Sequence, residues 1–168
     1  IVPSSKNAAF SRSSKGWFAS PSKAGAETMN VSVSGVLNGN RKNFNGGTFR
    51  IIKPPPGAGS ITGFGKVITN GNSIPSALLQ NGLVTGAKPA DFFYDFNINI
   101  TGFDIKVGNL PAKTVKGNRV SDSPDAVKDV RSAGKNTSVV ISKIKASMVD
   151  GKIVTPNYVV DTFFVTIK

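Results

Sequence analysis

The sequence predicts a mainly β protein, in which a small strand-and-turn unit is joined by a proline-rich linker to an antiparallel β domain with two short helices. Two observations support this fold class. Apolar and polar side chains alternate almost continuously over residues 92–107, and a period of two is typical of a strand with one buried face. The 168 residues also include 18 glycines and 10 prolines with 39% hydrophobic residues, which indicates a folded, turn-rich chain.

Residues 1–53 are predicted to form the first unit. Trp17-Phe18 is a short apolar element, and residues 29–34 alternate between apolar and polar side chains, as a strand does. Asn38-Gly39 predicts a hairpin, since this pair readily adopts the positive φ angles of a type I′ turn. A further strand is expected over residues 49–52. Three or four strands are too few for a closed sandwich.

Residues 54–59 are predicted to be a linker. Pro54-Pro55-Pro56-Gly57 contains three residues that cannot donate to a β ladder, and such a run favours an extended, semi-rigid segment. The alternative is a proline-rich ligand for an SH3-like partner, which would require a flanking specificity residue and an exposed segment. We favour the linker.

Residues 60–168 are predicted to form the second, β-rich domain. A short helix is expected over residues 73–81, with Ser73 as N-cap, Pro75 in the first turn and Asn81-Gly82 as its end. A strand is expected to follow at residues 83–85.

The alternating stretch at 92–107 predicts the central strand of this domain. Tyr94, Phe96, Ile98 and Ile100 share one parity and are expected in the core, together with Phe163 and Val165. Thr101-Gly102 interrupts the pattern, which predicts a bend, a bulge or a second strand before Phe103, Ile105 and Val107 resume it.

The C-terminal part predicts a second helix and two further strands. Ser123-Pro124-Asp125 has the cap, proline and acidic first turn of a helix start, and Gly134 is expected at the helix end. A strand is expected over residues 137–145. Asp150-Gly151 is then expected to turn the chain toward the last strand, in which Phe163, Val165 and Ile167 share a face opposite Phe164 and Thr166.

The residue types present argue against an enzyme. The chain has no His and no Cys, which excludes imidazole bases, thiol nucleophiles, disulfides and the usual zinc or copper sites. Most acidic residues have local explanations: Asp95 and Asp104 are expected to face water on strands, Asp122 and Asp125 to start a helix, and Asp150 to lie in a turn. We therefore predict no catalytic residue.

Cofactor and metal sites are not predicted either. Gly57-Ala58-Gly59 and Gly63-Phe64-Gly65 lack the motifs of phosphate-binding loops and are interpreted as turns. Asp91 and Asp95 could hold a hard cation, but no calcium-binding loop pattern follows them. We expect no cofactor and no specific metal.

The net charge of +12 raises the question of an anionic partner. The basic residues are scattered singly and lack the clusters and interleaved aromatics of a phosphate-tracking groove, so we expect no nucleic-acid partner. Two groups of cations are candidates for a protein contact, the alternative being ordinary solvated charges. They are Lys113, Lys116 and Arg119, expected in a loop, and Lys128 and Arg131 on the second helix.

Four blocks of sequence occur in a fixed order: FRI at 49–51 before the proline-rich joint, DFFYDFNINITGFDIKV at 91–107, KGNRV at 116–120, and ISKIKASMVDGKI at 141–153 followed by FVTIK at 164–168. This series resembles the C-terminal periplasmic part of the GldM and PorM family. There, a Phe-Asp-Phe type strand, a Lys-Gly-Asn-Arg segment, a Gly-Pro-Asp-Gly type hairpin and a terminal Phe-Lys-Ile strand follow one another. Residues 47–168 carry most of the resemblance, and residues 16–36 are more loosely similar.

The sequence departs from the family pattern at two places. Val149 stands where the family hairpin often has Pro, and residues 165–167 lack the basic residue that is commoner near the end of the last strand. Both departures bear on the subfamily and not on the assignment.

The resemblance implies a structural part of a type IX protein secretion system or gliding motor. It implies that residues 1–53 are the end of a penultimate immunoglobulin-like domain, and that the whole protein is anchored in the inner membrane by an N-terminal helix outside this chain. The implied protein is periplasmic and homodimeric. Its implied partners are the outer-membrane ring lipoprotein with that lipoprotein's own partner and, through the missing N-terminal region, an inner-membrane motor protein.

A further expectation concerns the first unit. A sandwich that lacks strands leaves an unpaired edge, which a second chain can complete, so we expect a dimeric or strand-exchanged protein.

The competing function is a cell-surface module that binds carbohydrate or polyanions. It would require Trp17, Phe18, Phe92 and Phe93 to form an exposed aromatic platform, and burial of all four would exclude it.

Overall fold

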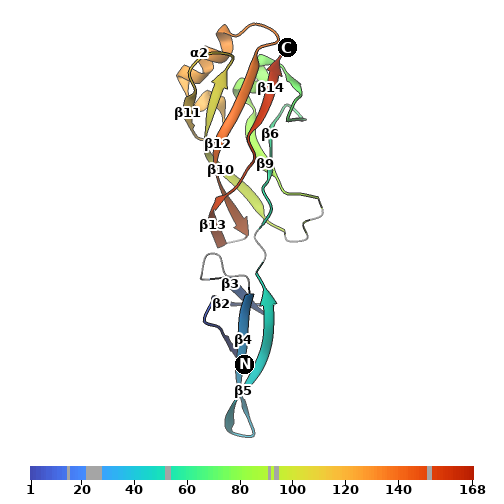
Figure 1. The fold of residues 1–168 in the computed structure, drawn as a ribbon, viewed down its shortest axis with the longest axis vertical. Coiled ribbons are helices and arrows are strands. Elements are labelled where there is room, and N and C mark those ends of the chain that lie inside the picture. Colours follow the sequence, from blue (N-terminus) through green and yellow to red (C-terminus); the bar gives the residue numbers. More distant parts are fainter. Residues whose placement is uncertain (15, 22–27, 52–53, 91, 93–94, 151–152) are drawn as a thin grey trace. The chain divides into compact units, whose positions relative to one another are not determined.

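The computed structural model describes residues 1–14, 16–21, 28–51, 54–90, 92, 95–150 and 153–168. The protein is mainly β with antiparallel sheets and two α-helices, which confirms the predicted fold class. It divides into two compact units, Ile1–Pro54 and Pro55–Lys168, called unit 1 and unit 2 below (Figure 1).

Unit 1 contains a three-stranded antiparallel sheet and a separate hairpin. The sheet has the order β1 (Val2–Ser4), β4 (Thr28–Leu37), β5 (Asn40–Arg50), and the hairpin pairs β2 (Ala8–Ser13) with β3 (Gly16–Pro21). The described residues thus form five strands, more than the expected three or four. The strand expected at 49–52 is the end of β5, and Ile52 lies outside the described residues. Asn38 and Gly39 have φ angles of 53° and 75°, as the predicted hairpin requires.

Unit 1 has a small core. In β4 the predicted alternation is present: Val31 is buried, Met29 and Val33 are half-buried, and Asn30 and Ser32 are exposed. Among the described residues of this unit, Ala8 and Val31 are the only buried hydrophobic ones. On the partner strand β5, Phe44 and Phe49 pair with Val33 and Met29 but stay 50% and 48% exposed. The apolar face of this sheet is therefore incompletely covered.

Unit 2 is built on a six-stranded sheet. Its strands are β11 (Lys113–Lys116), β10 (Asn97–Val107), β12 (Ser138–Asp150), β14 (Phe163–Ile167) and β8 (Ser73–Ile74) in this order, with β13 (Ile153–Tyr158) also paired to β12. All pairs are antiparallel except β14 with β8. The expected turn at Asp150-Gly151 leads into β13 and not directly into the last strand. Asp150 itself ends β12 and pairs with Ile153, and Gly151 lies outside the described residues.

A second sheet consists of β7 (Lys66–Thr69), β6 (Ala58–Gly63) and β9 (Leu83–Ala87). The predicted linker over 54–59 and the predicted turn at Gly57-Ala58-Gly59 both extend too far, because β6 begins at Ala58. Ala58 and Gly59 belong to the strand, and the Gly57 N–H donates to the Val159 carbonyl at 2.9 Å. Gly59 is required there because an added Cβ would overlap the Phe163 ring. The expected turn at 63–65 is confirmed, with positive φ at Phe64 and Gly65.

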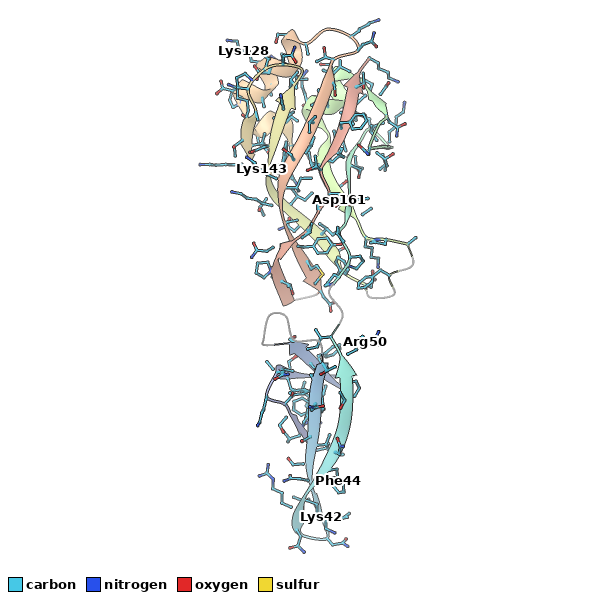
Figure 2. The ribbon with its side chains drawn as sticks, in the orientation of Figure 1. Lys42, Phe44, Arg50, Lys128, Lys143 and Asp161 are labelled. Carbon is cyan, nitrogen blue, oxygen red and sulfur yellow. The ribbon has the colours of Figure 1, made fainter. Side chains whose placement is uncertain are left out.

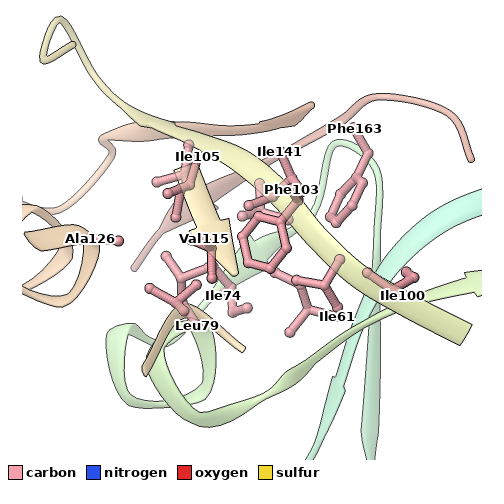
Figure 3. Packing of buried hydrophobic residues seen from close by; sticks show 14 of the residues in the cluster. Ile61, Ile74, Leu79, Ile100, Phe103, Ile105, Val115, Ala126, Ile141 and Phe163 are labelled. Atoms are coloured by element: carbon pink, nitrogen blue, oxygen red, sulfur yellow. The ribbon is translucent and has the colours of Figure 1, made fainter. Parts of the chain in front are cut away.

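The core of unit 2 lies between the two sheets and the helices α1 (Ser76–Asn81) and α2 (Pro124–Ser132). One face of the six-stranded sheet contributes Phe103, Ile105, Ile141, Phe163 and Val165, all at most 2% exposed. Figure 3 shows these side chains meeting others of β6, α1 and α2. The predicted alternation of the last strand is confirmed, since Phe163, Val165 and Ile167 are buried. Phe96 is buried as expected, Ile98 is half-buried against the core, and Tyr94 lies outside the described residues.

Strand β10 is shorter than predicted because it begins at Asn97. The described aromatic residues before it pack together instead: the Phe96 ring lies edge-on to Phe92 at 6.0 Å and to Tyr158 at 5.4 Å between centroids. The predicted interruption at Thr101-Gly102 is a β-bulge, since the register to β12 shifts on both sides of Gly102.

The predicted N-cap is wrong for the first helix and confirmed for the second. Helix α1 begins at Ser76 with Pro75 as N-cap and no side-chain cap, so Ser73 is not its cap; Ser73 lies in β8 and pairs with Thr166. The second helix is confirmed, because the Ser123 side chain accepts a hydrogen bond from the Ala126 N–H at 3.4 Å. A 3₁₀ turn, η1 (Val120–Asp122), precedes α2, and the helix ends at Ser132, just before Gly134. Ala126 and Val130 are the buried residues on the apolar side of this helix.

Candidate functional site

The predicted basic loop at Lys113, Lys116 and Arg119 is not a loop throughout. Lys113 and Lys116 are the first and last residues of β11, which forms one edge of the six-stranded sheet. Lys113 shares its parity with the buried Val115, and Lys116 has the opposite parity. Side chains of opposite parity leave a strand on opposite faces, so these two lysines do not form one cluster.

The two predicted arginines are engaged within unit 2. The Arg119 Nη1 donates to the Asn81 carbonyl at 2.9 Å, and this carbonyl belongs to the last residue of α1. The Arg119 backbone N–H donates to Asp122 Oδ2 at 3.0 Å. The Arg131 Nε donates to Gln80 Oε1 at 3.1 Å. Both arginines therefore hold the end of α1 in place, a role that the sequence analysis did not predict.

Lys128 is exposed on α2 (Figure 2). It lies beside a shallow hollow. The hollow is lined by Ser121, Pro124, Val127, Lys128, Arg131 and Ser132. The five predicted residues are thus spread over an edge strand, the start of η1 and one helix. They do not converge on a single site.

A different group of cations does share one surface. We call it the outer face: the side of the six-stranded sheet opposite the core. Its members are Lys106, Lys116, Val140, Lys143, Lys145 and Phe164. The four lysines are exposed, and Figure 2 shows Lys143 extending away from the ribbon. The sequence analysis missed this group. Side-chain parity along the predicted strands already placed Lys106 and Phe164 away from the core, but the register between the strands, which brings them together, was not known.

The pairing of the strands brings the members of the outer face together. Gly102 lies between Lys116 on one side and Lys145 on the other. Two rows further along the same face, beyond the row of Asp104 and Ser142, Val140 lies between Lys106 and Phe164. Lys106 therefore adjoins the apolar pair of Val140 and Phe164, whereas Lys116 and Lys145 lie two rows away from it.

One acidic residue, Asp104, belongs to the same side of the sheet. Its Oδ1 accepts a hydrogen bond from Thr114 Oγ1 at 2.7 Å, and its Oδ2 lies 3.0 Å from Lys143 Nζ. These hydrogen bonds from Thr114 and Lys143 hold the pKa of Asp104 below its usual value. Asp104 lies on the side of β10 away from the core, as expected, but Thr114 and Lys143 leave its side chain only 15% exposed.

The apolar part of the outer face is a shallow hollow between β12 and β14. It is lined by Asn70, Ser138, Val140, Thr162, Phe163 and Phe164. Phe164 is 45% exposed there, although its neighbours Phe163 and Val165 are buried.

The other acidic residues have local roles. Asp95 lies before β10, not on it as expected, and its highly exposed carboxylate is 2.6 Å from Lys88 Nζ. The Lys88 hydrogen bond lowers the pKa of Asp95. Asp122 and Asp125 lie at the start of α2 as expected, while Asp91 is outside the described residues. In the described part of the chain, no three potential metal ligands gather, and no helix is long and apolar enough to cross a bilayer.

Comparison of the chain with models of known protein families and with curated protein sequences found no match. The function is therefore argued from the residues themselves.

Proposed function

We propose that this chain is a structural, non-enzymatic part of a type IX secretion or gliding motor in the periplasm, which couples an inner-membrane motor to an outer-membrane ring through protein contacts. The observation that carries the proposal is the ordered series of motifs from residue 49 to residue 168 and its resemblance to the GldM and PorM family. Each motif is common by itself, and their order and spacing are what support the assignment.

Three physical features agree with this role. The chain has no His and no Cys, so the most versatile catalytic side chains are missing. It consists of two compact β units that meet at Pro54 and Pro55, and proline limits the freedom of a connecting segment. Tyr158 Oη also donates to the Pro55 carbonyl at 2.7 Å, which fixes the start of unit 2. A force-transmitting component requires stiff units and short joints, and it requires no nucleophile.

The proposal includes a homodimer completed through unit 1, as the end of an immunoglobulin-like domain. The support is the exposed apolar surface of that unit: Phe44 and Phe49 are about half exposed, and β5 has an unpaired edge among the described residues. Light scattering at high protein concentration is expected to give the mass of a dimer. A monomeric mass there would refute this part of the proposal.

A pull-down tests the proposal as a whole. The immobilised chain is expected to retain the purified outer-membrane ring lipoprotein and that lipoprotein's partner at near-physiological salt, in preference to heparin and duplex DNA. Retention of the polyanions alone would mean that the net charge, and not the motif series, is the better guide to function.

A carbohydrate- or polyanion-binding module is the second candidate, because Trp17 and Phe18 are each 40% exposed. Three findings weaken it. Trp17 and Phe18 are successive residues of β3, so they point to opposite faces and form no common platform. Arg12 lies over the Trp17 ring at 6.0 Å from its centroid. Phe92 is half-buried, and Phe93 lies outside the described residues. The heparin arm of the pull-down decides between the two candidates.

A further inference from the structure

We infer that the outer face of unit 2 is the surface that docks the ring, and that it fits a protein surface that carries acidic residues beside an apolar side chain. This inference deepens the proposed function and rests on it. It differs from the sequence-based expectation, which placed the contact at Lys113, Lys116, Arg119, Lys128 and Arg131.

The first argument is charge. Lys106, Lys116, Lys143 and Lys145 are exposed on the outer face. Asp104 and Asp150 are the only acidic residues in the six strands. Asp104 is already held by Thr114 and Lys143, and Asp150 has core-side parity at the far end of β12. The surface therefore presents a net positive potential to a partner.

The bulge in β12 concentrates this charge. Asp104 pairs with Ser142, whereas Gly102 pairs with Lys145, so β12 has one more residue than β10 over this interval. The extra residue lets Lys143, at φ 48°, reach the same side of the sheet as Lys145. Gly102 has no side chain between Lys116 and Lys145, and the Lys145 stem passes 3.7 Å from where a Cβ of Gly102 would lie. Loss of the bulge would send one of these lysines toward the core.

The second argument is the exposed apolar pair Val140 and Phe164. Lys106, Val140 and Phe164 form one cross-strand row, and the hollow beside Val140 and Phe164 is open to solvent. Protein interfaces typically combine an apolar anchor with a polar rim, and aromatic residues are frequent anchors. Nucleic acids and sulfated sugars instead require cations that follow their backbone. An exposed apolar pair beside these cations therefore favours a protein partner.

The surface on α2 is a weaker candidate for the docking site than the outer face. Arg131 and Arg119 already donate to Gln80 and Asn81, so a partner that recruited them would have to replace these hydrogen bonds. Lys128 then remains as the exposed cation beside that hollow.

The test compares charge reversals on two surfaces of the whole chain. Binding of the purified ring lipoprotein and its partner is measured by biolayer interferometry at near-physiological salt. The double variant Lys106→Glu/Lys145→Glu is expected to bind about tenfold more weakly or worse. Phe164→Ser, which alters a half-exposed side chain, is expected to bind several-fold more weakly. Lys66→Glu, an exposed lysine of β7 in the other sheet, is the matched control and is expected to change binding less than about threefold.

Circular dichroism and thermal melting confirm that each variant is folded before its binding is compared. Lys128→Glu, a charge reversal on α2, is measured beside them. Unchanged binding by both outer-face variants, or a loss of binding confined to Lys128→Glu, would overturn the inference and leave the proposed function standing. Failure of the wild-type chain to bind the ring would overturn both. If the wild-type chain binds heparin but not the ring, and the outer-face variants lose heparin binding, the partner is a polyanion and not a protein.

Discussion

Unit 1 and unit 2 are both antiparallel β structures, but they differ in how far they bury their side chains. Every residue of the hydrophobic core cluster lies in unit 2, where Phe103, Ile61 and Val165 are almost completely buried. In unit 1, Ala8 and Val31 are buried among the described residues, and Phe44, Phe49 and Leu37 stay about half exposed. Both units have regular strand pairing, so hydrogen-bonded ladders are not what distinguishes them.

The difference shows what a second layer contributes. Unit 2 closes its sheet with a second sheet and two helices, and the net stability of a domain comes largely from apolar area removed from water. The sheet of unit 1 has one small hairpin beside it. A three-stranded sheet with so little burial is marginal by itself. We therefore expect the two units to unfold separately, and the following predictions test this contrast in order of decreasing effect.

The largest expected effect is the separate unfolding of unit 1. Trp17 is the only Trp of the chain and lies in β3, so its fluorescence reports on unit 1, whereas far-ultraviolet circular dichroism reports mainly on unit 2. In urea, the fluorescence midpoint is expected at a lower concentration than the dichroism midpoint. If a second copy completes unit 1, only the fluorescence midpoint will rise with protein concentration. Coincident midpoints at every concentration would show that the units unfold as one.

A core truncation in unit 2 is expected to cost far more than its counterpart in unit 1. Phe103 is 1% exposed, so Phe103→Ala should lower the free energy of unfolding of unit 2 by about 3–5 kcal/mol. Phe44 is 50% exposed, so Phe44→Ala should lower that of unit 1 by less than about 1 kcal/mol. Urea titrations followed by the two signals measure both values. Similar losses at the two positions would contradict the contrast in burial.

Gly59→Ala is expected to destabilise unit 2 by about 1–3 kcal/mol, because the added Cβ would meet the Phe163 ring and the Asp161 carbonyl, the latter at 2.8 Å. Gly134→Ala is the matched control, since nothing lies within 4 Å of its added Cβ and its φ is not in the left-handed region. Its effect should stay within about 0.5 kcal/mol. Thermal melts of both variants give the comparison, and equal stabilities would mean that β6 does not approach β14 this closely.

Arg119→Ala is expected to cost about 1 kcal/mol of unit 2 stability, since the Asn81 carbonyl loses its guanidinium donor at the end of α1. Lys128→Ala, on the exposed side of α2, should change stability by less than about 0.5 kcal/mol. Chemical denaturation separates the two. An Arg119→Ala variant as stable as the wild type would mean that Arg119 does not stabilise the end of α1.

The smallest expected effect is the pH dependence contributed by Asp104. Its hydrogen bonds from Thr114 and Lys143 lower its folded-state pKa, so its contribution is complete above the unfolded-state pKa of about 3.9. That contribution is lost as the pH falls through the lowered folded-state pKa. The stability difference between wild type and Asp104→Asn should therefore be below about 1 kcal/mol at pH 7 and shrink on acidification below about pH 4. A difference that grows on acidification would reverse the sign and refute this account.

Short-range patterns in the sequence predicted the local structure of this protein well. The Asn38-Gly39 turn, the bulge near Gly102, the Ser123 cap and the buried face of β14 each depend on residues that are close together in the chain. Backbone preferences and side-chain parity act over a few residues, so they can be read without knowledge of the fold. The same reasoning explains why the fold class was predicted correctly.

The errors occurred where a distant partner decides the outcome. Ser73 has the composition of a helix cap, but pairing with Thr166 makes it part of a strand. Gly57-Ala58-Gly59 has the composition of a turn, but pairing with β9 makes Ala58 and Gly59 part of β6. Local propensity is a weak preference, and tertiary pairing overrides it.

The candidate site, too, was determined partly by the sequence and partly by the tertiary structure. The sequence by itself determined that the chain is strongly basic, lacks His and Cys, and carries Phe164 on the opposite parity from the core residues of β14. Only the tertiary structure decided which cations act together. Strand register places Lys106 beside Val140 and Phe164 and brings Lys116 and Lys145 to either side of Gly102, while the packing of α1 engages Arg119 and Arg131. The physical reason is that charge is a property of single residues, whereas a surface is a property of the register between strands that are far apart in the chain.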